Sequence, residues 1–134
     1  MKKCLRFIRI WSVPIVVAIS VLCIFRFVLI LGYVPSGSME PTLKTGSFIV
    51  GFRIHPEPKV GDIVVFQYGG KVMVKRIAAA GGEVIDHKGE LITIPRNHYY
   101  MLGDNASDSF DSRYWDDPFV PEGDIIALVL QFTS

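Results

Sequence analysis

The 134-residue sequence has only two cysteines, Cys4 and Cys23, and both lie near its N-terminus. If that segment is helical, the two cysteines are roughly 28 Å apart along the helix axis, because each residue adds about 1.5 Å. A disulfide bond cannot span this separation, so we expect no internal disulfide. The residues after 34 contain no cysteine, which excludes a cysteine nucleophile from that part of the chain.

A strong net charge and metal-ligand patterns are also missing. The formal net charge is +1, which gives no basis for a nucleic-acid-binding surface. The three histidines, His55, His87 and His98, do not have the spacing of zinc ligands. The acidic residues of 103–115 lack the EF-hand spacing, since no glutamate closes a twelve-residue loop. We therefore expect neither a metal site nor a nucleic-acid partner.

The first 34 residues contain a long apolar segment with a basic start. Ile10–Phe25 carries no charge, Arg26 interrupts, and Phe27–Val34 is again uncharged. A membrane-spanning helix needs about 20 predominantly apolar residues, so a modest extension of the first run is long enough. A cleaved secretory signal would need a small-residue cleavage site after the apolar core, and residues 26–31 do not supply one. The pattern predicts an uncleaved membrane anchor at residues 1–34.

The charges around this anchor predict its orientation. Four basic residues precede the apolar run: Lys2, Lys3, Arg6 and Arg9. Such an excess favours a cytoplasmic N-terminus, which places residues 35–134 as one domain on the extracytoplasmic face. Arg26 can extend its guanidinium toward a headgroup region if it lies near a helix end. Phe27–Val34 either completes the span or lies along the membrane surface, and both options stay open.

After residue 40 the sequence has no helical periodicity of useful length and instead contains short segments rich in β-branched and aromatic residues. Gly69-Gly70 is typical of a two-residue hairpin turn, and His87–Gly89 indicates a second hairpin. Many short strands with glycine and proline between them are typical of an antiparallel barrel or sandwich, so we predict a mainly β fold. The strands are expected at residues 47–52, 63–68, 71–77, 83–86, 91–94, 99–102 and 125–132.

A serine-containing turn, Ser36–Leu43, directly follows the apolar N-terminal segment. Gly37 allows a close approach of the backbone to a ligand in front of Ser38. Pro41 fixes its own φ and keeps Glu40 extended. Such a turn could present a serine hydroxyl, but Ser-Gly-Ser is also common in ordinary loops.

Lys75 lies between two apolar residues on one face of a predicted strand. Alternate residues of a strand share a face, so Met73 and Ile77 point the same way as Lys75. A lysine at a sheet edge in solvent is one interpretation. A desolvated lysine is the other, because burial lowers the pKa of an amine and lets it accept a proton from a serine hydroxyl.

The most polar part of the chain is residues 103–115. Gly103, Asp104 and Asn105 at its start favour a tight turn. Asp111 and Arg113 could pair with each other if the backbone bends, or each could hold another segment.

Taken together and in this order, these segments resemble the type I signal peptidases, a family of membrane-bound Ser-Lys endopeptidases. The resemblance covers roughly residues 10–130 and is closest to a minimal, single-anchor form, since only 27 residues separate Lys75 from Gly103. The segments that carry it are Ser36–Leu43, Gly61–Phe66, Lys75-Arg76, Gly103–Asn105 and Ser109–Arg113.

The resemblance implies a serine endopeptidase that removes signal peptides from exported preproteins at the membrane surface, without a cofactor. It implies that Ser38 is the nucleophile, Lys75 the general base, and the Ser36 hydroxyl with the Ser38 N–H the oxyanion hole. Ser109 would orient the lysine. The remaining implied residues are the turn Gly103, Asp104 and Asn105, the ion pair Asp111 and Arg113, and the substrate groove Pro35, Met39, Leu43 and Val74.

One departure and two alternatives accompany this interpretation. Ala106 stands where several family members have a basic residue, which leaves local ion pairing at that position open but not the catalytic pair. A conjugation- or pilus-specific peptidase with a narrow substrate range would share the same motifs. A membrane-tethered β-domain without catalysis is a different class, and it predicts that Ser38 and Lys75 are dispensable.

Overall fold

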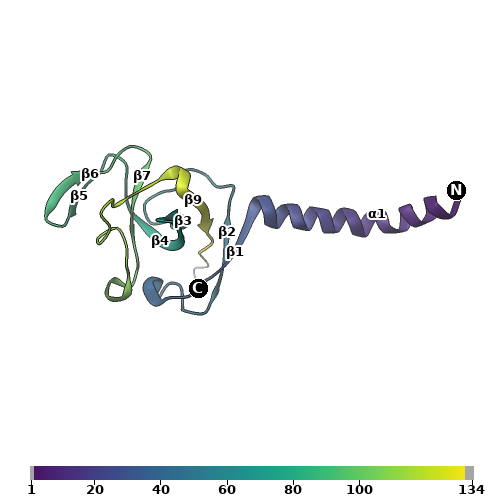
Figure 1. Ribbon diagram of the computed structural model, residues 1–134, viewed down its shortest axis with the longest axis horizontal. Helices are drawn as coiled ribbons and strands as arrows, with labels where there is room; N and C mark the ends of the chain where they lie inside the picture. Colours follow the sequence, from purple (N-terminus) through teal and green to yellow (C-terminus); the bar gives the residue numbers. More distant parts are fainter. Residues whose placement is uncertain (1, 132–134) are drawn as a thin grey trace.

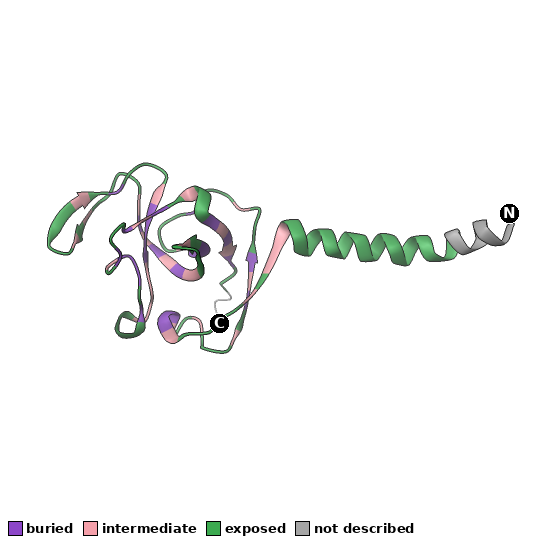
Figure 2. Cartoon of the chain, viewed as in Figure 1, coloured by how far each residue is buried: buried purple, intermediate pink, exposed green. Residues whose placement is uncertain are grey.

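The computed structural model describes residues 2–131, with side chains from residue 9 onward, and has a long N-terminal helix attached to a β-rich body (Figure 1). Helix α1 spans Lys2–Cys23 and continues into a π-helical turn, Ile24–Val28. From residue 9 to residue 27 every position is exposed, because the helix projects away from the body (Figure 2). The stretch Arg9–Val28 has a mean hydropathy of 2.2 and is long and apolar enough to cross a membrane. This helix could therefore be a membrane anchor.

The body is built on one seven-stranded sheet with the strand order β1-β2-β9-β3-β4-β7-β8. All of its paired strands run antiparallel. Its strands are β1 Leu29–Tyr33, β2 Phe48–Phe52, β3 Ile63–Tyr68, β4 Lys71–Ala80, β7 His98–Leu102, β8 Phe119–Pro121 and β9 Ile125–Val129. A separate two-stranded sheet consists of β5 Val84–His87 and β6 Glu90–Thr93. The predicted mainly β, antiparallel fold is confirmed.

Both predicted hairpin turns are present. Gly69 and Gly70 have φ of 54° and 77° between β3 and β4, as a two-residue hairpin turn with two positive φ angles requires. The turn between β5 and β6 likewise has positive φ at Lys88 and Gly89. The turn chemistry in the sequence thus set the register of two strand pairs.

Strand β1 was not expected, since the sequence continues the apolar character of the anchor into it. Its residues pair with β2 from Leu29↔Phe52 to Tyr33↔Phe48, so their backbone groups bond within the sheet. Phe27 and Val28 lie in the π-helical turn that ends the helix, and the rest of the segment Phe27–Val34 is mostly strand β1. The sheet begins six residues before the predicted boundary at residue 35, because hydropathy alone does not distinguish an edge strand from the end of a span.

Two smaller differences concern the C-terminal third. Strand β8 is only three residues long and pairs with β7, and its terminal Pro121 concealed it in the sequence. The predicted strand at 125–132 ends at Val129, and residues 132–134 lie outside the described residues.

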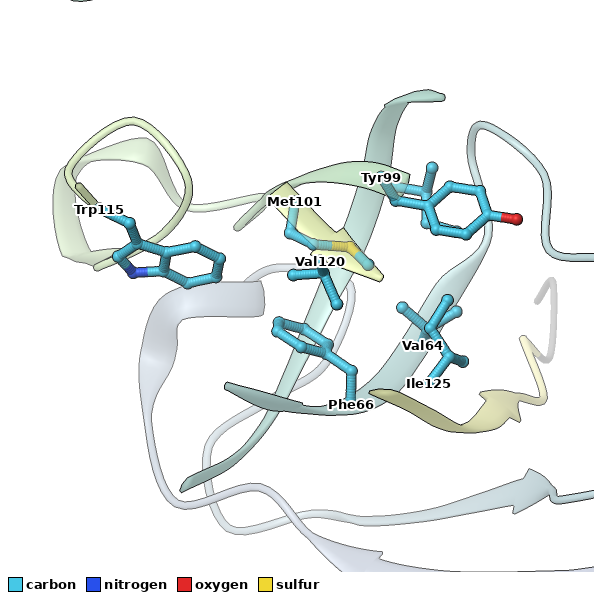
Figure 3. Packing of buried hydrophobic residues seen from close by; sticks show 8 residues of the cluster. Val64, Phe66, Tyr99, Met101, Trp115, Val120 and Ile125 are labelled. Carbon is cyan, nitrogen blue, oxygen red and sulfur yellow. The ribbon is translucent and has the colours of Figure 1, made fainter. Parts of the chain in front are cut away.

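Strand β3 lies at the centre of the hydrophobic core, since alternate residues enter two clusters. Val64 and Phe66 belong to a cluster with Ile77, Tyr99, Met101, Trp115, Val120 and Ile125 (Figure 3). Ile63 and Val65 belong to a second cluster with Val34, Met39, Ile49, Ala127 and Val129. Each fully buried side chain of this size contributes about 1.5–3 kcal/mol. Because Val34 precedes the serine turn and Met39 lies within it, the second cluster holds that turn against the sheet.

Candidate active site

Ser38 and Lys75 make direct contact at the centre of the candidate site. Lys75 Nζ donates a hydrogen bond of 2.6 Å to Ser38 Oγ. Ser38 lies in the 3₁₀ turn Gly37–Met39 that follows β1, and Lys75 lies in the middle of β4. The two residues are only 7% and 5% exposed although 37 positions separate them in the chain. Of the two alternatives for Lys75, the buried lysine is correct.

The surroundings of Lys75 lower the pKa of its amine. Burial lowers the pKa of Lys75 below its ordinary value of 10.5, because the charged ammonium loses solvation. The negative charges of Asp111 and Asp108 raise this pKa in part, and the positive charge of Arg113 lowers it again. Burial outweighs the two carboxylates, so the amine gives up its proton at a lower pH than a lysine in solvent.

Ser36 stands next to this pair. Its hydroxyl lies 3.4 Å from Ser38 Oγ, which is a long contact for two hydroxyl groups. The backbone of Ser36 is extended, with φ of −134° and ψ of 159°. Both serine hydroxyls of the Ser-Gly-Ser sequence therefore open toward the same side of the turn.

Asp111 anchors the polar turn behind Lys75. Arg113 binds its carboxylate with two hydrogen bonds, of 2.9 Å to Oδ1 and 2.7 Å to Oδ2. Gly103 N–H and the Ser109 hydroxyl also donate to Oδ2. Burial by itself raises the pKa of Asp111, but these donors outweigh it and hold the pKa below its ordinary value. The Ser109 hydroxyl thus donates to Asp111 and not to Lys75, which leaves its oxygen to accept.

The turn at 103–105 packs directly on the backbone of the serine turn. Asn105 N–H donates to Ser38 C=O at 3.0 Å, and its side-chain amide donates to Gly37 C=O at 3.1 Å. A Cβ on Gly103 would lie 2.5 Å from Ser38 O and 2.6 Å from Ser109 Cβ. Both distances are shorter than van der Waals contact, so any side chain here would clash. Glycine is therefore required at position 103 for the two turns to meet.

Asp104 connects three segments of the site. Arg76 binds its two carboxylate oxygens at 2.8 and 2.7 Å, and the Thr42 hydroxyl donates to it at 2.6 Å. Arg76 also donates to Gly61 C=O at 2.7 Å. The strand that carries Lys75 and the segment that follows Ser38 are thus tied to one carboxylate.

A cleft of about 640 Å³ opens beside the Ser38–Lys75 pair. It runs between β1 and the first half of β4, which pairs with β7 only from Arg76 onward. Of the four predicted groove residues, Pro35, Met39 and Val74 line this cleft. Leu43 instead packs against the second core cluster, next to Met39. A β-edge on each side of a largely apolar cleft fits an extended peptide that adds as a strand.

No histidine lines the cleft in the part of the chain that the structure describes. His55 and His98 contact backbone carbonyls near themselves in sequence, and His87 lies 3.4 Å from the Tyr100 hydroxyl. Among the described residues, no group of three or more His, Cys, Asp or Glu side chains could hold a metal ion. The Ser36 and Ser38 hydroxyls and the amine of Lys75 thus lie together in the cleft without a histidine beside them among the described residues.

Comparison with known proteins identifies the family. The profile described as "Signal peptidase, peptidase S26" matches residues 6–95 and 87–132, which is most of the chain. The chain belongs to the signal peptidase family, peptidase S26. The resemblance seen in the sequence motifs is thereby confirmed at the level of the family.

Individual signal peptidases are similar to the chain at low identity. Signal peptidase I of Pseudomonas aeruginosa is 27% identical, with 72% of this chain and 58% of the relative covered. Probable signal peptidase I-1 of Synechocystis sp. is 28% identical, with 73% and 67% covered. Probable thylakoidal processing peptidase 2 of Arabidopsis thaliana is 30% identical, with 61% and 32% covered. The chain spans little more than half the length of the Pseudomonas relative.

The positions of the predicted site residues in this member of the family follow from the geometry above. Ser36, Ser38, Lys75 and Pro35 lie in or beside the cleft, and the 103–105 turn packs against them. Sequence reasoning missed Arg76 and Thr42 as partners of Asp104. The position of Arg76 next to Lys75, on the opposite face of the strand, was visible, but nothing in the sequence indicated which acid it would meet.

Proposed function

We propose that the chain is a serine endopeptidase that removes N-terminal signal peptides from exported preproteins, with Ser38 as nucleophile and Lys75 as general base. The observation that carries the proposal is the buried 2.6 Å contact between Lys75 Nζ and Ser38 Oγ beside a cleft for an extended peptide. Family membership supports the same activity, and the specific residues are our assignment.

The mechanism begins with proton transfer from Ser38 to Lys75. The neutral amine turns its lone pair toward Oγ and takes the hydroxyl proton while Oγ attacks the carbonyl carbon of the scissile peptide bond. The Ser38 N–H and the Ser36 hydroxyl donate to the oxyanion that forms. The Lys75 ammonium then gives its proton to the departing amine, which leaves an acyl-enzyme. Lys75 next deprotonates a water molecule that releases the acyl group and restores Ser38.

The residues around the pair act as supports in this proposal. Ser109, whose hydroxyl donates to Asp111, is the residue that we assign to keeping the Lys75 amine aimed at Ser38. Asn105 fixes the carbonyl groups of Gly37 and Ser38, so the Ser38 N–H keeps its direction. Pro35, Met39 and Val74 form apolar contacts with small substrate side chains.

Substitution of the pair tests the proposal. Ser38→Ala and Lys75→Ala should each abolish cleavage of a preprotein with an Ala-x-Ala site, because each removes a group that no neighbour replaces. The measurement is cleavage by purified full-length enzyme in detergent, followed on gels. Val84→Ala, at an exposed position of β5 outside the cleft, is a matched control. Normal processing by either variant would contradict the assignment of Ser38 and Lys75 as nucleophile and base. It would favour a membrane-tethered domain in which these residues are dispensable.

The pH dependence is the second test of the lysine. Lys75 must be neutral to accept a proton, so activity should rise as the pH rises through the Lys75 pKa. Because burial lowers that pKa below 10.5, the rise should occur below the pH at which a lysine in solvent loses its proton. A rate that is constant from about pH 5 to 9 would contradict a lysine base, given the ordinary value for this side chain.

We also propose that α1 is a membrane anchor with its N-terminus in the cytoplasm and the body on the extracytoplasmic face. The basic residues before the apolar run support this orientation. Protease added to the cytoplasmic side of sealed vesicles should leave residues 40–134 intact. Digestion of residues 40–134 without detergent would show that the body faces the cytoplasm, opposite to the proposed orientation.

A further inference from the structure

Among the described residues that line the cleft, three have basic or acidic side chains: Lys71, Lys75 and Asp108. Lys75 is buried and engaged with Ser38. Lys71 lies four residues away at the start of β4, about 13 Å along an extended strand. Of the described lining residues, Asp108 is therefore the acidic one, and it lies close to the reacting pair.

Asp108 holds its carboxylate over the serine turn. It is the last residue of the 3₁₀ segment Ala106–Asp108, and its N–H donates to Asn105 C=O at 3.1 Å. A Cβ built on Gly37 would lie only 2.9 Å from Asp108 Oδ2, so this oxygen sits against the backbone between Ser36 and Ser38. Among the side chains described from residue 9 to residue 131, none forms an ion pair with it. The carboxylate is exposed and remains available to a bound substrate.

We propose that Asp108 is a specificity-determining residue of the cleft, which favours a basic side chain over an acidic one at a substrate position next to the scissile bond. This inference rests on the proposed peptidase function. Most of the residues that line the cleft are apolar, and Asp108 is the acidic one among those described. The Asp108 carboxylate attracts a basic side chain of the substrate and repels an acidic one. Such a charge affects the choice between substrates more than the overall binding affinity.

The same charge has a second effect that a purely structural residue would lack. Burial lowers the pKa of Lys75, Asp111 and Asp108 raise it, and Arg113 lowers it. Removal of the Asp108 charge should therefore move the active pH range toward lower pH. This readout is independent of the substrate series.

The experiment uses purified full-length chain in detergent and fluorogenic peptides with an Ala-x-Ala site. The first position after the scissile bond, and in a second series the x position, carries Lys, Gln or Glu in turn, while both alanines stay fixed. At one of these positions the wild type should prefer Lys over Glu by about two- to fivefold in kcat/KM, as expected for a partly exposed charge pair. Asp108→Asn should abolish this preference, and Asp108→Lys should reverse it. Asp124→Asn, an exposed acid away from the cleft, is the matched control.

Two negative results are distinguishable. If the wild type cleaves the Gln peptides but Asp108→Asn keeps the same Lys-to-Glu ratio at every position, the specificity role is wrong and the peptidase function stands. If the wild type cleaves none of the peptides, the proposed function itself fails, and the role of Asp108 fails with it.

Discussion

Two arginine–aspartate pairs support the Ser38–Lys75 contact, and they are built in opposite ways. Arg113 and Asp111 are two residues apart within one turn, and the Asp111 side chain is completely buried. Arg76 and Asp104 are 28 residues apart and join β4 to the 103–105 turn, with side-chain exposures of 28% and 16%. The Arg113–Asp111 pair therefore determines the electrostatic environment of Lys75, whereas the Arg76–Asp104 pair holds two segments of the site together.

The burial of the two pairs leads to different costs of breaking them. Asp111 without Arg113 would be an uncompensated charge in the interior, with only neutral donors left. Asp104 without Arg76 could be reached by water, which replaces part of the lost interaction. Substitutions of the two arginines are thus expected to differ in size and in kind.

The largest effect is expected for Arg113→Ala. It should lower the free energy of unfolding by about 3–5 kcal/mol, because the buried Asp111 carboxylate loses its cation. The unbalanced negative charge should also raise the pKa of Lys75, so the active range moves toward higher pH. Urea unfolding and a pH–rate profile measure the two effects.

Arg113→Lys is the control, because it keeps the charge but not the two-pronged hydrogen bonding. It should retain more stability than Arg113→Ala and the wild-type pH range. An Arg113→Ala variant with unchanged stability and pH profile would show that the local pair does not support the site.

A smaller effect is expected for Arg76→Ala. The loss of two charge-assisted hydrogen bonds at a partly exposed carboxylate should cost about 1–2 kcal/mol. The value of kcat should fall because β4 and the serine turn are held less firmly, while the pH of half-maximal activity stays in place. A shift of the pH profile as large as that of Arg113→Ala would contradict the division of roles between the pairs.

The smallest effect is expected for Thr42→Val, which keeps the shape of the side chain and removes its hydroxyl. Asp104 then loses one exposed hydrogen bond but keeps Arg76, so the cost should be about 0.5–1 kcal/mol. Thermal unfolding is sensitive enough to detect it, and Thr42→Ser should restore the wild-type value. A cost equal to that of Arg76→Ala would mean that Thr42 carries as much of the connection as the arginine.

The sheet was largely predictable because its strands have strong local signals. β3 is rich in β-branched and aromatic residues and begins and ends where the sequence indicated, and the glycine pair after it requires a hairpin. β1 was not predictable, since Leu29–Leu31 has the same apolar character whether it ends a helix or pairs with β2. A local sequence pattern indicates whether a segment prefers apolar or polar surroundings. It does not indicate which strand the segment pairs with.

The site was predictable as a set of residues and only partly as an arrangement. Family motifs singled out Ser38, Lys75 and Asp111, while Arg76 and Thr42 emerged only from the contacts of Asp104. Leu43 shows the opposite error, because an apolar residue next to the serine turn suits a groove and a core equally well.

The sequence by itself determined the kind of protein: an apolar helix, a run of short strands, and the motifs of a signal peptidase in their order. Tertiary structure decided the chemistry. A lysine in a strand could point to solvent or to the interior, and alternation of side chains does not separate the two. Pairing of β4 with β3, and packing of the Gly103 turn on Ser38, bury the amine and bring it to 2.6 Å from the hydroxyl. The lowered pKa of Lys75 is a consequence of that burial, which residues far apart in the sequence create together.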